Sequence, residues 1–249
     1  AFELGLVKPK PPKVRTGKKV AVIGSGPAGL AASSQLNQAG HAVTLFERAD
    51  RIGGLVRYGI PDFKLDKNVI DRRLAVMEAE GVIFKTNTNI GSDISADELL
   101  NDFDAIVLTM GSTVPRDLKI EGRHLKGIYP AMEFLSQQNK RVSGIDREKD
   151  HRGAPYANGE ILATGKNVFV IGGGDTGSDC VGTSNRHGAK SITQIELLSK
   201  PSLERDITTP WPEWPMMLRT STSHEEGCTR EGSINTKAFI GDENGNLKA

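Results

Sequence analysis

Two glycine-rich turns are the parts of this sequence whose residue types and spacing best suit chemistry. Both fill the pattern G-x-G-x-x-G, with Gly24, Gly26 and Gly29 in VAVIGSGPAGL and with Gly172, Gly174 and Gly177 in VFVIGGGDTGSDC. Each turn follows a short β-branched run, at residues 19–23 and 167–171, and opens a stretch compatible with a helix. An acid follows 23 or 24 positions after the first glycine, at Glu47 and Glu196. A strand, these glycines, a helix and a distant acid together indicate a dinucleotide-binding turn.

Each position of such a turn has a physical requirement. The first glycine permits the tight change from strand to helix, the second leaves room for a pyrophosphate, and the third lets helix and strand pack closely. Backbone N–H groups at the start of the helix, together with its dipole, attract the phosphates. The acid at the end of the next strand can accept hydrogen bonds from ribose hydroxyls. The alternative for either segment is an ordinary strand-to-helix turn without a ligand.

The two turns belong to an internal repeat. A shift of 148 positions places the three glycines of the first turn on those of the second and Gly40 on Gly188, and one further residue brings Glu47 to Glu196. Gly40 and Gly188 stand where each helix should end, as C-cap glycines do. We therefore predict an α/β fold with two Rossmann-like dinucleotide-binding domains, at residues 18–114 and 115–249, after a proline- and lysine-rich linker at 1–17.

The composition argues against several other functions. The 249 residues include 32 basic and 31 acidic side chains, so we expect no binding to nucleic acid or to a membrane surface. No apolar run approaches the ~20 residues of a membrane span, and we recognise no signal peptide. Cys180 and Cys228 lack C-x-x-C spacing, so we expect neither a metal site nor a redox disulfide. Free thiols favour a cytoplasmic location.

The segments between and after the turns give weaker signals. Residues 53–61, GGLVRYGIP, are too glycine-rich for a packed element, and we expect a loop there, followed by a helix at 67–80. An apolar strand in DAIVLTMGS completes the first unit. Near the end, Asn244–Gly245 predicts a hairpin turn, and a chain that stops just past it suggests a fragment of something larger.

Residues 200–230 contain both tryptophans and four of the twelve prolines. Prolines on either side of Trp214 argue against a helix, so we interpret the segment as a stiff loop that packs its aromatic side chains on the core. The alternative is a wall of a nicotinamide pocket, with Arg205 or Arg219 supplying positive charge. Of the five histidines, only His224 in SHEEG is a candidate for chemistry.

Several longer segments resemble the small (beta) subunit of glutamate synthase, and the resemblance runs over essentially the whole chain. They are GKKVAVIGSGPAGLAAS, GGLVRYGIPDFKLDK, PRDLKIEGRHLKGI, IGGGDTGSDCVGTSNRHGA, TTPWPEWP, TSHEEGC and FIGDENGN. The reductase region of dihydropyrimidine dehydrogenase and the ferredoxin–NADP reductase-like subunits share the two turns and GGLVRYGIP. GTSNRHGA and PWPEWP are the stretches that favour glutamate synthase.

The resemblance implies a subunit that passes hydride from NADPH to FAD. In that family the electrons continue through iron–sulfur clusters to the large subunit, where 2-oxoglutarate and glutamine-derived ammonia become glutamate. The residues implicated in FAD binding are Gly24, Ser25, Gly26, Pro27, Ala28, Gly29, Glu47, Arg48, Gly54, Leu55, Arg57, Gly59, Ile60, Pro61 and Gly111. Those implicated in NADPH binding are Gly172, Gly173, Gly174, Asp175, Thr176, Gly177, Glu196 and Arg205. The family's cysteine-rich domain and its late return to the FAD domain have no counterpart here, so we expect an incomplete FAD domain and cluster ligands outside this sequence.

Hydride transfer between a nicotinamide and a flavin is chemistry of the cofactors, so we expect no catalytic side chain. Three functions stay open. The first is an NADPH-dependent flavin reductase module that feeds the glutamate synthase large subunit or another partner. The second is a self-contained disulfide or quinone reductase, although the lack of C-x-x-C counts against a disulfide. The third is a nucleotide-binding or docking piece without turnover.

The choice of nicotinamide nucleotide is ambiguous in the sequence. An acid at the position of Glu196 hydrogen-bonds a free 2′-hydroxyl and so favours NADH, because a 2′-phosphate would repel it. The resemblance to bacterial glutamate synthases implies NADPH. Arg186, Lys200 and Arg205 are candidate partners of the 2′-phosphate. We favour NADPH, with Arg205 as the preferred partner and Glu196 directed elsewhere.

Overall fold

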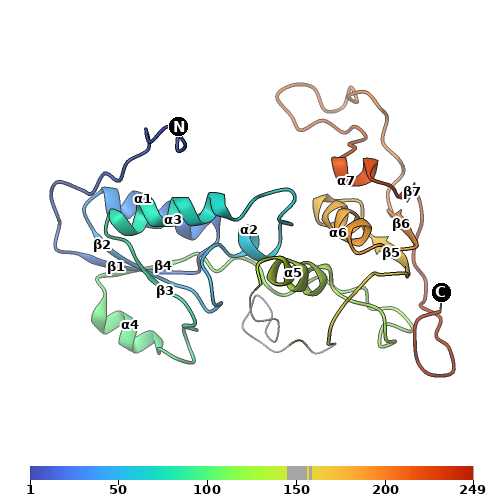
Figure 1. Cartoon of the computed structure of the whole chain (residues 1–249), viewed down its shortest axis with the longest axis horizontal. Helices are drawn as coiled ribbons and strands as arrows, with labels where there is room; N and C mark the ends of the chain where they lie inside the picture. Colours follow the sequence, from blue (N-terminus) through green and yellow to red (C-terminus); the bar gives the residue numbers. More distant parts are fainter. Residues whose placement is uncertain (145–155, 157–158, 249) are drawn as a thin grey trace. The chain divides into compact units, whose positions relative to one another are not determined.

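The computed structural model describes residues 1–144, 156 and 159–248. The chain divides into two compact units, which are described separately (Figure 1). Unit 1 contains Ala1–Pro115 and Asn139–Ala157, and unit 2 contains Arg116–Gln138 and Asn158–Ala249. Both units are built on parallel sheets with helices, which confirms the predicted α/β class.

Unit 1 has four parallel strands in the order β3-β2-β1-β4. They are β1 (Lys19–Ile23), β2 (Ala42–Phe46), β3 (Ile83–Lys85) and β4 (Ala105–Leu108). Helices α1 (Pro27–Gln38) and α3 (Asn68–Ala79) lie on one face of the sheet and α4 (Ala96–Asp102) on the other (Figure 1). A short helix, α2 (Leu55–Tyr58), connects the end of the β2 region to α3.

The strands of unit 1 are apolar at nearly every position because both faces of the sheet are covered. In β1, Val20 and Val22 join a core with side chains of α1 and α3. Ala21 and Ile23 of the same strand join a second core with Leu99 of α4. Successive side chains of a strand point to opposite faces, so one apolar run supplies both cores.

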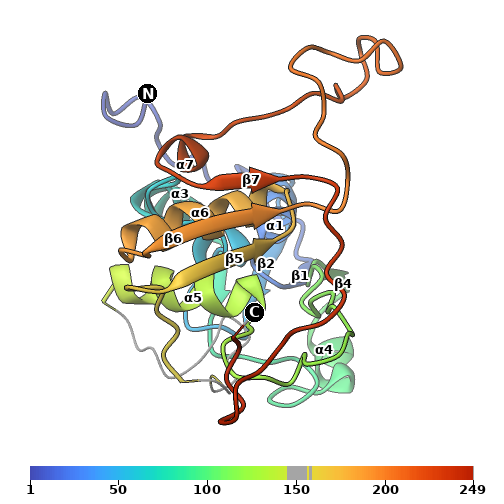
Figure 2. The same cartoon turned by 90° about the vertical axis from the view of Figure 1, so that its right-hand side faces the viewer.

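Unit 2 has a second parallel sheet, in the order β5-β6-β7 (Figure 2). Its strands are β5 (Asn167–Ile171), β6 (Ser191–Ile195) and β7 (Thr229–Glu231), and its helices include α6 (Asp175–Arg186) and α7 (Thr222–Glu225). Helix α5 (Ala131–Val142) runs across the division, and its Phe134 and Leu135 belong to the core of unit 2.

The strand pairing confirms the internal repeat. Lys19 of β1 pairs with Ala42, and Asn167 of β5, 148 positions later, pairs with Ser191. Ser191 follows Ala42 by 149 positions, so the one extra residue predicted from the sequence lies between the strands. The same supersecondary unit therefore occurs once in each half.

Glycines end the repeated helices as predicted. Gly40 follows α1 with φ +99°, donates its N–H to Asn37 O at 2.9 Å, and is followed by a bond from His41 N–H to Leu36 O at 3.1 Å. Gly188 follows α6 with φ +72° and the same pair of bonds. This left-handed cap satisfies carbonyls that the helix leaves unpaired, and a Cβ would disfavour it.

Residues 53–61 differ from the predicted open loop. Leu55–Tyr58 form α2, in which Arg57 and Tyr58 are only 4% and 1% exposed. The Tyr58 hydroxyl donates to Asp50 Oδ1 at 2.7 Å, and Asn139 Nδ2 donates to the Tyr58 carbonyl at 3.0 Å. Partners distant in the chain, which local composition does not reveal, therefore pack this segment.

The tryptophans also differ from the prediction. Trp211 and Trp214 are 83% and 76% exposed instead of packed on the core. Residues 200–219 extend away from the strands of unit 2 as a long loop (Figure 2). Within it, the Arg219 guanidinium lies over the Trp214 ring, 3.6 Å from its centroid, so a cation–π contact takes the place of core burial.

The amino-terminal segment makes specific contacts with unit 1. Arg15 donates to Asn37 Oδ1 at 2.8 Å, to His41 O at 2.9 Å and to Glu80 O at 3.1 Å. These acceptors lie at or near the carboxyl ends of α1 and α3, where a positive charge is favourable. Residues near Arg15 are thus part of the packed structure of unit 1.

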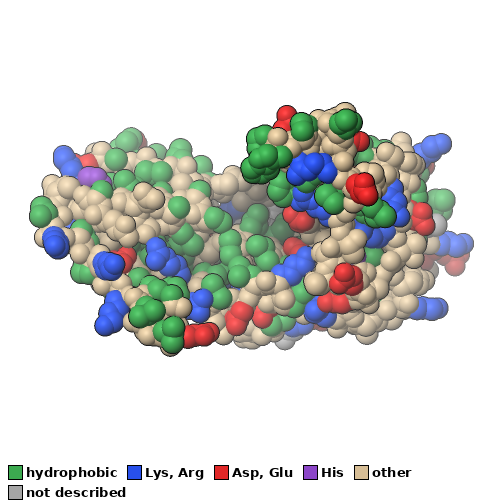
Figure 3. Space-filling view, turned by 90° about the horizontal axis from the view of Figure 1, so that it is seen from above, with side chains coloured by type: hydrophobic (Ala, Val, Ile, Leu, Met, Phe, Trp, Pro, Cys, Tyr) green, Lys and Arg blue, Asp and Glu red, His purple; other side chains and the backbone are tan. Residues whose placement is uncertain are grey.

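The end of the chain forms the predicted hairpin turn. Gly245 has φ +74° and donates to Asp242 O at 3.1 Å, and Gly241 and Leu247 form an antiparallel bridge. On the face shown in Figure 3, basic and acidic side chains are interspersed, as the balanced composition predicts. Among the described residues, the structure has no helix that is long and apolar enough to cross a membrane.

Candidate nucleotide-binding sites

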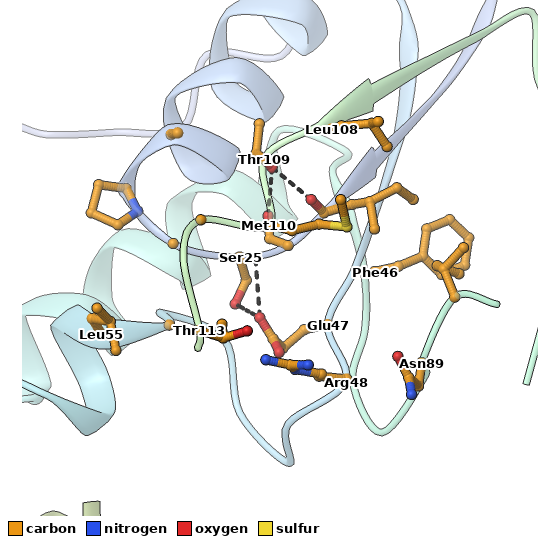
Figure 4. Close-up of a pocket in the computed structure, with 18 of the residues that line it drawn as sticks. Ser25, Phe46, Glu47, Arg48, Leu55, Asn89, Leu108, Thr109, Met110 and Thr113 are labelled. Carbon is orange, nitrogen blue, oxygen red and sulfur yellow. Dashed lines mark hydrogen bonds between the residues drawn. The ribbon is translucent and has the colours of Figure 1, made fainter. Parts of the chain in front are cut away.

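A pocket of about 570 Å³ lies in unit 1 at the carboxyl ends of β1, β2 and β4 (Figure 4). Ligands of open parallel sheets bind beyond the carboxyl ends of the strands where the strand order reverses, which here is between β1 and β4. The predicted residues that line it are Gly24, Ser25, Gly26, Pro27, Ala28, Glu47, Arg48, Gly54, Leu55 and Gly111. The structure therefore gathers most of the residues predicted for the first nucleotide.

The three glycines of the first turn have different surroundings. Gly24 has φ +98°, and a Cβ there would lie 2.7 Å from the Thr109 carbonyl oxygen of the chain after β4. A Cβ on Gly29 would lie 1.9 Å from the Gly24 carbonyl oxygen, so helix and turn touch. A Cβ on Gly26 would meet nothing within 4 Å. Gly26 is thus the glycine that backbone packing does not require, and its open side faces the pocket.

These surroundings fit a nucleotide pyrophosphate. Gly26 is the N-cap residue of α1 and provides no side-chain hydrogen bond to the helix. The N–H groups of the first turn are then available to an anion, and the helix dipole favours negative charge at that point.

Glu47, an acid of the pocket lining, is held by several hydrogen bonds. Its Oε2 accepts the Ser25 N–H at 3.0 Å and the Ser25 hydroxyl at 2.5 Å (Figure 4). Its Oε1 accepts the Ala49 N–H at 2.9 Å. The carboxylate is 8% exposed, and its own backbone is tied to Lys85 and Thr88 beside β3. A buried carboxylate with such partners is positioned to accept a ribose hydroxyl.

Some lining residues were missed in the sequence. They come from the ends of β1 and β2, from the segment after β3 and from the end of β4 and the chain after it: Ile23, Phe46, Thr88, Asn89, Ile90, Leu108, Thr109 and Thr113. Met110 and Ser112, on either side of the predicted Gly111, line the pocket as well. Leu108 and Met110 are 67% and 58% exposed and give the pocket an apolar wall. The usable signal was their place directly after parallel strands, where ligands gather.

Other predicted residues lie outside the pocket lining. Gly29 packs on the turn itself, and Arg57, Gly59, Ile60 and Pro61 belong to or follow α2. Arg57 donates to Ile52 O at 2.6 Å and pairs with Asp71 of α3 at 2.5 Å. Lys67 donates to Ile60 O at 2.6 Å. The charges in this segment hold its backbone in place beside the pocket residues Gly54 and Leu55.

Asp50 and Tyr58 extend this network. Burial opposes ionisation of Asp50, but the hydrogen bond from Tyr58 and the nearby Lys140 ammonium outweigh it and hold the pKa of that carboxyl below its usual range. Burial and the bond to Asp50 raise the pKa of the Tyr58 hydroxyl well above its usual value. Both groups therefore keep one charge state at neutral pH and serve packing.

The turn of unit 2 repeats the geometry of the first with one difference. Gly172 has φ +117°, a Cβ on Gly177 would lie 2.4 Å from Gly172 O, and a Cβ on Gly174 would meet nothing within 4 Å. Glu196 Oε2 accepts the Gly173 N–H at 2.5 Å, as Glu47 accepts that of Ser25. The difference is at position 173, where a glycine replaces the serine of the first turn. The Glu196 carboxylate fills the space, and its Oε2 lies 2.4 Å from where a Cβ of residue 173 would be.

The remaining residues predicted for unit 2 are held by local contacts. Asp175 and Thr176 open α6 next to the turn. Arg205 donates to Thr209 O at 2.8 Å and to Glu213 O at 3.0 Å within the exposed loop. His224 lies in α7, where its Nδ1 accepts the Ser221 N–H at 3.1 Å and its Nε2 contacts Gln194 Oε1 at 2.9 Å. The contacts of His224 are those of a helix cap.

Comparison with known proteins agrees with this geometry. The family model described as pyridine nucleotide-disulphide oxidoreductase matches residues 18–211. The chain is 54% identical over 241 residues to the "Glutamate synthase [NADPH] small chain" of Mycobacterium tuberculosis, covering 97% of this chain and 48% of the relative. For the protein of the same name from Bacillus subtilis the identity is 49% over 254 residues, with 99% and 50% covered.

A longer relative and two solved structures extend the comparison. "Glutamate synthase [NADH]" of Schizosaccharomyces pombe is 52% identical over 257 residues, covering 100% of this chain and 12% of that protein. Mycobacterium tuberculosis FprA in complex with NADPH has a TM-score of 0.57 at 21% identity, covering 74% and 44% of the two chains. 2-Naphthoyl-CoA reductase has a TM-score of 0.64 at 20% identity, covering 96% and 32%. Both structures show a shared fold.

Relatives that are about half identical thus confirm the resemblance to glutamate synthase small chains. This chain spans about half the length of those small chains. Two nucleotide-type turns on parallel sheets, with an acid bound to each turn, agree with the family match over most of the chain. The protein is an oxidoreductase-family chain that belongs to the pyridine nucleotide-disulphide oxidoreductases.

Proposed function

We propose that unit 1 holds FAD, that unit 2 binds NADPH, and that hydride passes from the reduced nicotinamide to the flavin. The observation that carries the proposal is the repeated site geometry: in each unit an open glycine follows a strand, and a glutamate from the next strand accepts an N–H of the turn. We assign FAD to the predicted domain at residues 18–114 and NADPH to the predicted domain at residues 115–249. The names of the bacterial relatives support NADPH.

Each group of pocket residues has a proposed part in this function. Gly26 and Gly174 admit the pyrophosphates, and Glu47 orients the adenosine ribose of FAD. In unit 2 the Glu196 carboxylate stays on the Gly173 N–H, and Arg205 is the proposed partner of the 2′-phosphate of NADPH. Leu108 and Met110 provide an apolar surface that excludes water from a bound ring. The flavin, when bound, supplies the hydride acceptor and the means to pass electrons on singly. The protein supplies binding and orientation, so no side chain is assigned a proton transfer.

We propose the glutamate synthase large chain as the onward partner, because the names of the bacterial relatives describe a small chain of that enzyme. Electrons would leave through iron–sulfur clusters whose ligands lie outside this sequence, for the synthesis of glutamate from 2-oxoglutarate and glutamine in the cytoplasm. In the described part of the chain, no cluster of metal-ligating side chains is present that could hold such a centre.

The spectrum of the purified protein tests the proposal. We expect a yellow protein whose visible absorption bleaches when NADPH is added without oxygen, and heat-released flavin that chromatographs as FAD. A colourless protein that binds nucleotide would replace the proposal with a docking function. Bound FMN in place of FAD would overturn the cofactor assignment alone.

The coenzyme is tested by comparing apparent affinities for NADPH and NADH in the wild type and in Arg205→Ala. Removing a guanidinium that pairs with a phosphate should lower the apparent affinity for NADPH by about tenfold or more and leave the affinity for NADH nearly unchanged. Lys190→Ala, which removes an exposed basic side chain just before β6, is the matched control. A wild-type preference for NADH, or an unchanged ratio in Arg205→Ala, contradicts the assignment.

A further inference from the structure

We propose that Ser25 is a positioning residue that holds the Glu47 carboxylate in place for the adenosine ribose of FAD and so makes unit 1 retain its nucleotide. The inference rests on the proposed binding of FAD by unit 1 and adds a role for a side chain within the turn. Position 173, the equivalent of Ser25 in the repeat, is a glycine, so unit 2 lacks this device.

The Ser25 hydroxyl connects three segments of the chain. It donates to Glu47 Oε2 at 2.5 Å and accepts the Gly53 N–H at 2.9 Å. It thereby ties the glycine turn to the end of β2 and to the Gly53–Gly54 pair. Gly54 packs closely on the turn, since a Cβ on it would lie 2.9 Å from the Gly26 Cα. Ser25 is 0% exposed, so water cannot replace the hydroxyl if it is removed.

These bonds define which acceptor sites Glu47 has left. An ionised carboxylate has about four lone-pair sites, two on each oxygen. Oε2 accepts both the N–H and the hydroxyl of Ser25, and Oε1 accepts the Ala49 N–H. One site on Oε1 remains for a ribose hydroxyl, in a carboxylate that cannot rotate without breaking its other bonds. Such preorganisation lowers the cost of ordering the site on binding.

The acid of unit 2 is held more loosely. Glu196 accepts the Gly173 N–H at 2.5 Å and the Leu198 N–H at 3.4 Å, and it is more exposed than Glu47. The Glu196 carboxylate itself fills the space that a side chain at position 173 would need. The two turns thus differ in the direction expected if the first nucleotide stays bound and the second exchanges in each catalytic cycle.

The test measures dissociation constants for FAD and for two FAD analogues that lack the 2′- or the 3′-hydroxyl of the adenosine ribose. Apoprotein of the wild type, Ser25→Ala and Ser25→Cys is compared, with Ser33→Ala as the matched control. Ser33 of α1 is also a 0% exposed serine of unit 1, but its hydroxyl has no hydrogen-bond partner among the described residues. The rate of FAD release is measured on the same proteins.

We expect the wild type to prefer FAD over at least one analogue by about tenfold, the value of one hydrogen bond to a charged group. Ser25→Ala should lose most of that preference and release FAD faster, Ser25→Cys should restore part of it, and Ser33→Ala should match the wild type. General damage to the fold would weaken the binding of FAD and of the analogues equally, so the ratio of their dissociation constants would not change.

The outcomes separate this inference from the proposed function. An unchanged FAD-to-analogue ratio in Ser25→Ala, or an equal loss in Ser33→Ala, overturns the role of Ser25 while FAD binding stands. A wild type that binds FAD without discriminating the analogues overturns the ribose contact of Glu47. A wild type that binds no FAD overturns the proposed function of unit 1 and this inference with it.

Discussion

At the scale of single residues, the glycines of a dinucleotide turn are not equivalent. In unit 1, Gly24 is required by its positive φ and Gly29 by contact with the Gly24 carbonyl, whereas Gly26 faces open space. Gly26 has φ −63° and ψ −178°, a conformation that any L-residue can adopt. The fold therefore leaves room for a side chain at this position, and only the proposed nucleotide would exclude one.

This difference gives a matched pair of substitutions. Gly26→Val should abolish FAD retention and leave the helix content and thermal stability of the apoprotein nearly unchanged, because a branched side chain would lie where the pyrophosphate binds. Gly29→Ala should lower the free energy of unfolding by about 3 kcal/mol, because the turn must open to admit the methyl group. Flavin stoichiometry, circular dichroism and thermal melting are the measurements. Full flavin content in Gly26→Val contradicts the site assignment.

At the scale of elements, helix ends in this protein are specified by side chains and glycines within a turn of the terminus. Helix α4 begins with a capping box, in which Ser95 Oγ accepts the Glu98 N–H at 3.2 Å and Glu98 Oε2 accepts the Ser95 N–H at 2.7 Å. The backbone and side-chain bonds from Ser95 lower the pKa of the Glu98 carboxyl. The cap therefore depends on Glu98 being ionised.

Ser95→Ala should destabilise the fold by about 1 kcal/mol, as loss of an N-cap side chain does. The pH dependence follows from the lowered pKa of Glu98: its contribution is complete above the pKa of an unfolded glutamate and is lost as the pH falls through the lower pKa of the folded state. Glu98→Gln should flatten the part of the stability curve that lies below the pKa of an unfolded glutamate, about 4.3. Urea denaturation across that range measures both effects. An identical acid slope in Glu98→Gln and the wild type argues against the cap.

At the scale of the whole molecule, one supersecondary unit occurs twice, and each copy is proposed to serve a different nucleotide. The register of β1 with β2 and of β5 with β6 shows that the copies share their construction. Their differences lie at the turn, where Ser25 is replaced by Gly173, and in the loops that follow β2 and β6. Function is thus differentiated by a few side chains on a repeated scaffold.

A ligand that binds only the folded state stabilises it, by about 2.7 kcal/mol at one hundred times its dissociation constant. We expect FAD and NADPH each to raise the melting temperature of the protein. Gly26→Val should abolish the FAD effect alone, and Gly174→Val, whose Cβ meets nothing within 4 Å, should abolish the NADPH effect alone. Differential scanning calorimetry with each nucleotide measures these shifts. If either substitution cancels the effect of the other nucleotide, the assignment of nucleotides to units is wrong.

Features that depend on neighbours in the chain were predictable from the sequence. Strands at 19–23 and 167–171 have the expected bounds, the helix expected at 67–80 is α3 (Asn68–Ala79), and Gly40 and Gly188 form the expected caps. Each follows from local chemistry, since β-branched runs favour strands and positive φ favours glycine. The two turns and the acids paired with them belong to this class because their spacing along the chain sets their geometry.

Features that depend on distant partners were decided only by the tertiary structure. Arg57 and Tyr58 of α2 are buried, and Asp50, Asp71 and Asn139 bond their polar groups, although the composition of the segment predicts a loop. Trp214 is exposed in the loop, where the Arg219 guanidinium lies over its ring. The sequence by itself determined the repeated strand–turn–helix units and the acid that serves each turn, because these rest on local periodicity and glycine stereochemistry. Only the folded chain decided that Ser25 bonds Glu47, that Arg57 lies outside the pocket and that Thr88–Ile90 line it, because long-range packing places those side chains.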